Sequence, residues 1–537
     1  MRITYIKNGK TYITDSSNDD LNIILDDKDN RHIVRLLAKQ DIKLVSANEV
    51  IPFHVNFKDR YFLNGYQSWT DSHEYSLFKR LRNIKKSPHI ISRLFAMRAY
   101  GDSYFYKYSI RKSHGYDFFY SKGNYESFII NLNSSIAYLL IELIKDRRSI
   151  YLTSDVNGIK LGKSQTIKIF DYYFFDNFEK GLEEFNRRFP KKNIEKLFGY
   201  TSWYNYYQNI NEEIILRDLN ALDTRFNLFQ IDDGYETFVG DWLDVDNKKF
   251  PNGLKPIVDS IHEKGYKAGL WLAPFVAEEK SKLFNEHKDW IKRNAKGQLV
   301  KSGGNWSGHY ALDLDKKEVR DYVKECLEHY MEMGFDFFKL DFLYAAGLIP
   351  SENKSRSQTQ REAYQFLRDV LKDKLILGCG ANIANSIDIF DYLRVGPDVS
   401  LEFDDVAYMR LFHRERISTK VTIQNTIYRS FFDQRLFAND PDVFLLRDGN
   451  IKLNSEQRKA LTKINALFGS LLMTSDNIAS YQKEQKQILD QSLEIFRHAD
   501  VVSYETNKGN IKVVYKINEE EHEFLYNTKK GVLVYDR

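Results

Sequence analysis

Residues 1 to about 190 consist of short apolar and aromatic runs separated by polar turn residues. The runs, such as Ser127–Leu132 and Thr166–Phe170, are rich in β-branched and aromatic side chains. The segments between them, such as 15–20 and 121–124, contain mainly Asn, Asp, Ser and Gly. This alternation is typical of antiparallel strands joined by turns. We therefore predict an N-terminal β-sandwich over residues 1–190.

The pattern changes after residue 190, where apolar runs of strand length alternate with segments of helical period. In 316–333 the apolar side chains recur every three or four residues, namely Val319, Val323, Leu327 and Tyr330. Strand–helix alternation over this length favours a parallel sheet with crossover helices, and the length suits one (β/α)₈ TIM barrel. We predict this barrel over residues 191–478, with strands that begin near residues 198, 226, 267, 335, 375, 392, 431 and 468.

From about residue 480 the pattern returns to β structure. Gly509–Ile517 and Gly531–Tyr535 have the composition of strands, which predicts a small antiparallel β domain over residues 479–537. The whole chain is therefore expected to be a multidomain α/β and β protein. Its central (β/α)₈ barrel carries an N-terminal antiparallel β-sandwich and a small C-terminal β-sheet domain.

The composition limits the classes of binding partner and the cellular compartment that we expect for the chain. The chain has 79 Lys and Arg against 75 Asp and Glu, a net charge of +4, which disfavours nucleic-acid and anionic-membrane partners. Only Cys326 and Cys379 are present, so no disulfide framework is expected. The N-terminus has no apolar signal segment, and no run approaches the ~18 apolar residues of a membrane span. We expect a cytoplasmic chain, and leave monomer or homo-oligomer open.

The predicted barrel strands end in ionisable and aromatic residues, where the active site of this fold lies. Lys339 and Asp341 are two residues apart on one strand, so both side chains point to the same side. A cation next to a carboxylate favours its ionised form, and an ionised and a protonated carboxyl together form the pair of a glycosidase. A single such aspartate is better explained as a strand-end salt bridge, whereas aspartates at three strand ends favour an active site.

Several motifs resemble the catalytic barrel of glycoside hydrolase family 36, the retaining α-galactosidases. The resemblance runs from about Gly199 to about Arg447, and Asn64–Trp69 is also similar to a loop that reaches the barrel mouth in this family. The barrel motifs occur in this order: Gln230–Tyr235, Gly240–Trp242, Gly269–Phe275, Phe338–Phe342, Leu377–Gly380 and Arg394–Asp398.

The resemblance implies the catalytic pair. Asp341 is similar to the family's nucleophile, which attacks the anomeric carbon and forms a covalent galactosyl-enzyme. Asp398 is similar to the general acid/base, which protonates the departing oxygen and then deprotonates the incoming water. No cofactor is implied, and the absence of His-Glu-x-x-His or Cys-x-x-Cys spacing predicts no metal site.

The resemblance also implies the residues that bind the sugar. Asp232 and Asp233 would hold the 4- and 6-hydroxyls, and Lys339 and Arg394 would hold other ring hydroxyls. Cys379 and Gly380 would lie beside the 2-position, where a Cys leaves little space for an N-acetyl group. The other members of the expected pocket are four aromatic residues, namely Trp69, Trp203, Tyr204 and Trp271. His309 is interpreted as structural, and Asn382–Asn385 receives no role.

The implied activity is exo-acting hydrolysis of terminal non-reducing α-D-galactosyl residues by double displacement with retention. Raffinose-type oligosaccharides, melibiose and aryl α-galactosides are the expected substrates, so the expected partner is a small oligosaccharide. An α-N-acetylgalactosaminidase or a galactosyl transferase on the same scaffold is the nearest alternative. A carbohydrate-binding protein without catalysis, or a metal-dependent barrel hydrolase, is a more distant one.

Overall fold

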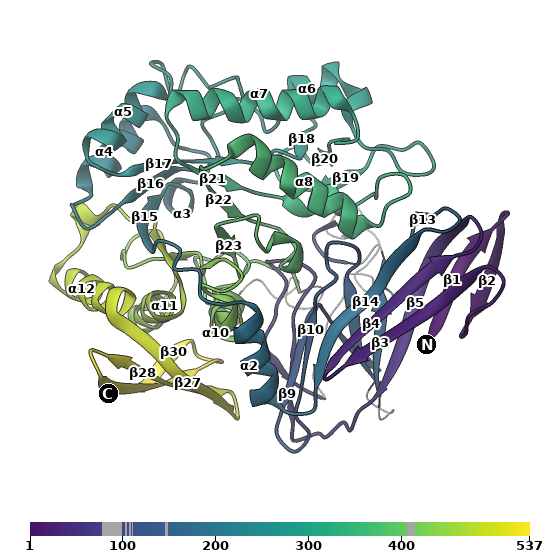
Figure 1. The fold of residues 1–537 in the computed structure, drawn as a ribbon. Coiled ribbons are helices and arrows are strands. Elements are labelled where there is room, and N and C mark those ends of the chain that lie inside the picture. Colours follow the sequence, from purple (N-terminus) through teal and green to yellow (C-terminus); the bar gives the residue numbers. More distant parts are fainter. Residues whose placement is uncertain (78–98, 103–104, 107–108, 110, 145–148, 405–413) are drawn as a thin grey trace.

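The computed structural model describes residues 1–77, 99–102, 105–106, 109, 111–144, 149–404 and 414–537 (Figure 1). Its N-terminal part contains two seven-stranded antiparallel sheets. One sheet has the order β2-β1-β5-β12-β11-β8 with β13 on β5, and the other has the order β3-β4-β14-β10-β9-β6-β7. Apolar residues from both sheets form one shared core, as in a sandwich, and every second side chain of β12 (Ser149–Ser154) is buried.

The remaining sandwich strands are short, and their bounds follow the apolar runs of the sequence. They are β1 (Arg2–Lys7), β2 (Lys10–Thr14), β3 (Leu21–Lys28), β4 (Arg31–Ala38), β5 (Ile42–Pro52), β6 (Arg60–Leu63), β7 (Glu74–Ser76), β8 (Lys112–Tyr116), β9 (Phe118–Lys122), β10 (Ser127–Asn131), β11 (Leu139–Ile144), β13 (Lys160–Leu161) and β14 (Thr166–Phe175). Helix α2 (Phe178–Arg188) follows and packs on β9, β10 and β14.

The central sheet is parallel and nine-stranded, with the order β24-β23-β22-β21-β17-β16-β15-β26-β25. Only Pro441 and Asp442 separate its two end strands along the chain, so the ends meet and the sheet curves into a barrel. The strands are β15 (Leu197–Thr201), β16 (Leu228–Ile231), β17 (Lys267–Leu272), β21 (Phe337–Leu340), β22 (Leu375–Gly378), β23 (Tyr392–Arg394), β24 (Ala438–Asp440), β25 (Val443–Phe444) and β26 (Leu471–Thr474). The expected barrel architecture is confirmed.

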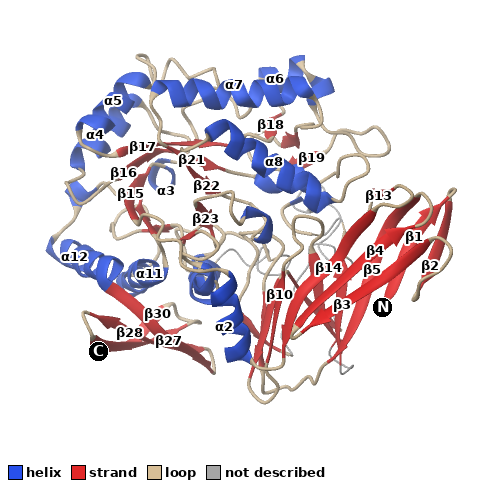
Figure 2. Ribbon diagram, in the orientation of Figure 1, coloured by secondary structure: helices blue, strands red, loops and turns tan. Residues whose placement is uncertain are grey.

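Helices cover the outside of this sheet (Figure 2). Helix α7 (Lys317–Met333) buries the four apolar side chains that its sequence period predicts, and it ends at Gly334, whose positive φ of 112° suits glycine. The other covering helices are α4 (Glu212–Ala221), α5 (Lys255–Glu263), α8 (Arg356–Leu371), α10 (Thr419–Tyr428) and α11 (Ser455–Phe468). Short pieces lie in the loops, namely α3 (Trp203–Tyr206), α6 (Lys282–Glu286) and the small sheet of β18 (Val276–Glu278), β19 (Lys301–Gly303) and β20 (His309–Ala311).

Two sequence expectations need correction. The seventh strand, predicted near residue 431, begins at Ala438, because residues 430–432 form a 3₁₀ turn after α10. The return to β structure predicted from about residue 480 comes later, since helix α12 spans Lys483–His498. Its buried Leu489, Leu493 and Phe496 share one helical face.

The C-terminal sheet is antiparallel and follows chain order. It contains β27 (Ala499–Asn507), β28 (Asn510–Ile517), β29 (Glu520–Asn527) and β30 (Val532–Asp536). Its apolar face joins the core of the barrel through α11 and α12. In the part of the chain that the structure describes, no helix has both the length and the apolar character needed to cross a bilayer.

Candidate active site

A cavity of about 340 Å³ opens at the carboxyl ends of the barrel strands. Eight residues named from the sequence line it: Trp69, Trp203, Asp232, Asp233, Trp271, Lys339, Asp341 and Asp398. Nine further residues, to which the sequence assigned no role, complete the lining: Tyr100, Gly304, Asn305, Trp306, Phe342, Pro397, Glu415, Arg416 and Ile417. The fold therefore brings five of the predicted strand ends and the N-terminal loop to one cavity.

Asp341 follows β21 directly and is held at both carboxylate oxygens. Trp271 donates its indole N–H to Oδ2 at 3.1 Å, and the backbone N–H of Phe342 donates to Oδ1 at 2.8 Å. Only 8% of the residue is exposed, and this burial raises the pKa of Asp341. The Lys339 ammonium opposes that rise, whereas the negative charge of Asp398 adds to it. Asp341 is thus a fixed carboxyl whose charge depends on its neighbours.

Lys339 forms its ion pair with Asp232 and not with Asp341. Its Nζ lies 2.8 Å from Asp232 Oδ2, and both residues are almost fully buried. Burial works against the ammonium, but the Asp232 carboxylate outweighs this effect and raises the pKa of Lys339. Thr201 and Gln230 also donate to Asp232 Oδ2, at 3.1 and 2.6 Å. The second and fourth strand ends are therefore tied together by a charged pair at the cavity floor.

Asp233 accepts hydrogen bonds from Trp306 Nε1 at 2.8 Å and from Gln208 Nε2 at 3.0 Å. Burial raises the pKa of Asp233, and it also raises the pKa of the neighbouring Glu236 well above its ordinary value. The charge of Asp233 adds to the rise at Glu236, because two adjacent buried carboxyls do not both ionise readily. Glu236 Oε2 accepts the backbone N–H of Gly234 at 3.3 Å.

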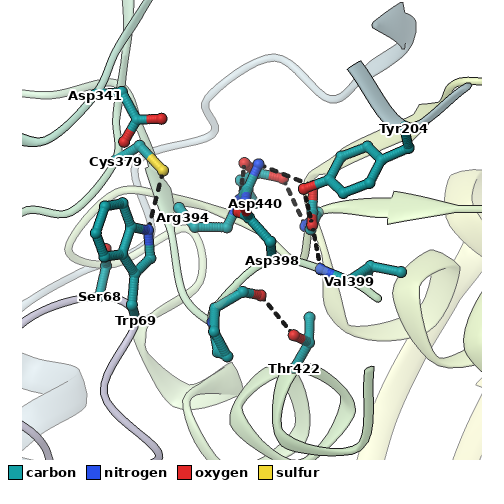
Figure 3. Close-up of polar contacts among 12 residues, drawn as sticks. Ser68, Trp69, Tyr204, Asp341, Cys379, Arg394, Asp398, Val399, Thr422 and Asp440 are labelled. Carbon is teal, nitrogen blue, oxygen red and sulfur yellow. Dashed lines mark hydrogen bonds and ion pairs between the residues drawn. The ribbon is translucent and has the colours of Figure 1, made fainter. Parts of the chain in front are cut away.

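Asp398 lies four residues beyond the end of β23 and is more open than Asp341. Its side chain is 35% exposed, while that of its partner Arg394 is 3% exposed. Arg394 Nη1 lies 3.0 Å from Asp398 Oδ1, and the same guanidinium pairs with Asp440 and Asp442. Figure 3 shows this cluster between Tyr204 on one side and Trp69 with Cys379 on the other. Asp440 and Asp442 were not predicted from the sequence.

The loop that carries Trp69 belongs to the N-terminal part, yet it is built into the barrel mouth. Trp69 donates its indole N–H to Cys379 Sγ at 3.3 Å. Gly380 has a positive φ of 62°, and a side-chain carbon there would lie 3.0 Å from the Trp69 ring, so the position requires glycine. The fully buried Arg429 donates to Ser68 O at 2.6 Å and thereby fixes the loop.

Four predicted site residues lie just outside the lining, namely Tyr204, Cys379, Gly380 and Arg394. Tyr204 donates its hydroxyl to Asp442, and burial raises the pKa of Cys379, which keeps it a thiol. His309 is fully buried, bonded to Ser302 at 2.8 Å and packed against Trp306 and Phe342. Burial lowers the pKa of His309 to about 3, in agreement with a structural role.

The asparagines at 382 and 385 connect the barrel to the sandwich. Asn382 donates to Tyr66 O at 2.7 Å, and Asn385 donates to the hydroxyl of Tyr138 at 3.4 Å. Trp306 was missed because it lies in the glycine-rich loop between β19 and β20. A tryptophan is unusual in a short loop of small and polar residues, and this is the signal that could have identified Trp306.

Comparisons with known proteins agree with this architecture. Residues 191–373 match the Melibiase family. The chain is 31% identical over 172 residues to α-galactosidase Mel36A of Lactobacillus acidophilus, covering 30% of this chain and 23% of that protein. It is 28% identical over 196 residues to an α-galactosidase of Escherichia coli, covering 35% and 27%. These matches span about a quarter of each relative's length.

Solved structures resemble the chain over almost its whole length. TtGalA, an α-galactosidase from Thermus thermophilus in complex with p-nitrophenyl α-D-galactopyranoside, has a TM-score of 0.73 at 23% identity and covers 97% of this chain and 98% of its own. The glycoside hydrolase family 36 α-galactosidase AgaA from Geobacillus stearothermophilus has a TM-score of 0.61 at 12% identity, with 94% and 75% covered. The fold resemblance expected from the motifs is confirmed.

Proposed function

Because residues 191–373 match the Melibiase family and the chain has the fold of glycoside hydrolase family 36, we propose that it is an exo-acting α-galactosidase. It would release terminal non-reducing α-D-galactosyl residues from small oligosaccharides and aryl α-galactosides. The observation that carries the proposal is the common cavity lined by Asp341 and Asp398. Related solved structures hold p-nitrophenyl α-D-galactopyranoside, stachyose and raffinose, which agrees with this substrate class.

In the proposed first step, Asp341 attacks the anomeric carbon while Asp398 gives its proton to the glycosidic oxygen. The C1–O bond breaks, the aglycone leaves as an alcohol, and a galactosyl ester of Asp341 remains. The Trp271 and Phe342 N–H groups hold the attacking carboxylate in place. Arg394 Nη1 donates to Asp398 Oδ1 and so holds the proposed acid/base.

In the second step, Asp398 removes a proton from water, and the hydroxide oxygen attacks C1 and releases Asp341. Two inversions give net retention. The exposure of Asp398 suits this role, because the same carboxyl must meet first the aglycone and then water. The burial of Asp341 suits a nucleophile that touches only the sugar.

The sugar would lie between charged acceptors and aromatic walls. Asp232 and Asp233 would accept additional hydrogen bonds from sugar hydroxyls, and a sugar epimer would lose these charge-assisted contacts. Trp69 and Trp306 supply flat apolar surfaces for the ring faces. The Cys379 thiol behind Trp69 narrows the space at the 2-position, which favours galactose over N-acetylgalactosamine.

The stereochemical course tests the mechanism. With an aryl α-galactoside followed by NMR, we expect the α-anomer of galactose to form first. A β-anomer that forms first would contradict retention. A panel of α-galactosides, α-N-acetylgalactosaminides and sucrose as an acceptor separates hydrolysis of galactosides from the two alternative activities.

A cytoplasmic location is part of the same proposal. Both cysteines are buried and free, which suits a reducing compartment. Fractionation of cells that express the chain, with activity measured in each fraction, tests this point.

A further inference from the structure

Two buried aspartates, Asp440 at the end of the seventh barrel strand and Asp442 two residues later, both contact Arg394. Asp440 Oδ2 lies 2.7 Å from Arg394 Nε, and Asp442 Oδ1 lies 2.9 Å from Arg394 Nη2. The third partner of the guanidinium is Asp398, at 3.0 Å from Nη1. Each nitrogen of Arg394 therefore faces a different carboxylate. The orientation of the group that holds Asp398 is set by the two residues behind it.

Asp442 has a second connection to Asp398. Its Oδ2 accepts the backbone N–H of Val399, the residue directly after Asp398, at 2.7 Å, and it also accepts the hydroxyl of Tyr204. Asp442 is 1% exposed and lies outside the cavity lining, so it does not touch a bound sugar. Asp440 makes no such contact with residue 399; its other acceptor oxygen takes the N–H of Asp442.

The backbone at Asp442 supports a specific role for this side chain. Its φ is +71°, a left-handed conformation that residues other than glycine adopt at a cost. Such a conformation persists where surrounding contacts fix it. Here it turns one carboxylate toward both Arg394 and the Val399 N–H.

We propose that Asp442 is a positioning residue for Asp398, which it holds through the Val399 backbone and through the Arg394 guanidinium. This inference rests on the proposed function and deepens it. The consequence is specific to proton transfer. Misplacing Asp398 impairs protonation of the leaving oxygen, while the attack by Asp341 is left intact.

The test compares leaving groups in Asp442→Asn. This variant keeps an acceptor for Val399 and Tyr204 but presents an amide N–H to Arg394. For melibiose, whose leaving alcohol needs a proton, we expect kcat/KM to fall about 10- to 100-fold, part of the 10²–10⁴-fold effect of a general acid. For 2,4-dinitrophenyl α-galactoside, whose phenolate leaves unaided, we expect a fall of less than about threefold. Inhibition by galactose should be unchanged.

Asp218→Asn is the matched control. Asp218 is also fully buried and accepts two tyrosine hydroxyls, those of Tyr200 and Tyr206, each at 2.7 Å, beside Arg217. It lies outside the cavity lining. We expect this variant to lower the melting temperature and to change kcat/KM for both substrates by the same factor. A leaving-group dependence in Asp218→Asn would show that loss of stability alone produces the effect.

Equal losses on both substrates in Asp442→Asn, or no loss, would overturn the inference. If Asp442→Asn does not fold, Asp440→Asn provides the test, because it removes one contact of Arg394 and should give a smaller loss of the same kind. Its failure to discriminate between the substrates would then overturn the inference. If the wild-type chain cleaves neither substrate, the proposed function fails, and this result is distinct from the other two.

Discussion

The two carboxyls at the fourth and sixth strand ends have opposite surroundings. Asp341 is 8% exposed and accepts uncharged N–H groups from Trp271 and Phe342. Asp398 has a side chain that is 35% exposed and is held by the guanidinium of Arg394. Asp341 is thus fixed by N–H donors in the buried part of the cavity, whereas Asp398 lies in its more exposed part.

The difference shows how one residue type serves two proposed roles. A nucleophile must meet one carbon atom at one angle, so fixed donors and burial suit it. An acid/base must exchange protons with two partners in turn, which requires access for water. The two roles therefore predict different losses when each carboxyl, or a residue beside it, is replaced.

Loss of the Asp341 carboxylate should have the largest effect. We expect Asp341→Gly to lower kcat on the order of 10⁶-fold, as removal of a nucleophile does in other hydrolases. Azide should enter the vacated space and give the β-galactosyl azide from an activated aryl α-galactoside. Product analysis by NMR checks the anomer. Full activity, or an α-azide product, would remove Asp341 from the proposed role.

Asp398→Ala should be less damaging and depend on the substrate. We expect about 10²–10⁴-fold lower kcat/KM for melibiose, and a much smaller loss for 2,4-dinitrophenyl α-galactoside. Here azide attacks the galactosyl-enzyme, so its product should be the α-galactosyl azide. The two variants are therefore expected to give galactosyl azides of opposite anomeric configuration. The same anomer from both variants would contradict the two different roles.

Removal of the Lys339 charge should affect the Asp341 carboxyl and not the Asp398 carboxyl. Burial raises the pKa of Asp341 above its ordinary 3.8, and Lys339 limits that rise. Asp341 must be ionised to attack, so activity is lost as the pH falls through its pKa. In Lys339→Met we expect this acid limb of kcat/KM to move to higher pH, with at least about a tenfold loss at neutral pH because Asp232 is left unpaired. Lys339→Arg keeps the charge and should retain the wild-type limb; an unmoved limb in Lys339→Met would contradict the assignment.

The smallest effect is expected at Trp69, which lines the cavity that Asp341 and Asp398 share. Trp69→Phe removes the indole N–H that Cys379 accepts, worth about 1 kcal/mol or a fivefold change. We expect this change in KM for melibiose, with kcat nearly constant. Titration of the variant with galactose by calorimetry measures the same loss in binding. A change in kcat alone would indicate that Trp69 acts on one of the two carboxyls.

The sequence predicted the parts of the site that local patterns encode. Asp341 and Asp398 follow apolar runs, and a strand end is a local feature that motif spacing reveals. Six of the eight barrel strands begin within two residues of their predicted positions. The seventh was misplaced because the aromatic run at 430–432, which has the composition of a strand, forms a 3₁₀ turn and β24 begins six residues after it. Asp440 ends that strand and Asp442 comes two residues later, so the error also concealed them.

Other site residues carry no local signal. Tyr100, Trp306 and Glu415 come from loops far apart in the sequence, and only the folded chain brings them to one cavity. The ion pair between Lys339 and Asp232 could likewise not be predicted from the sequence. Alternation along a strand gives the side to which a side chain points, but not which neighbouring strand supplies its partner. Helix α12 is different, because the period of Leu489, Leu493 and Phe496 was available in the sequence.

The anchoring of the Trp69 loop has a consequence for engineering the chain. Arg429 of the barrel binds Ser68 O, and Asn382 binds Tyr66 O, so the loop and the rim interlock. Excision of the first 190 residues would therefore remove one wall of the cavity and leave the buried guanidinium of Arg429 without most of its acceptors, although Val395 O would remain. Chimeras between related enzymes should inherit loop and rim from the same parent.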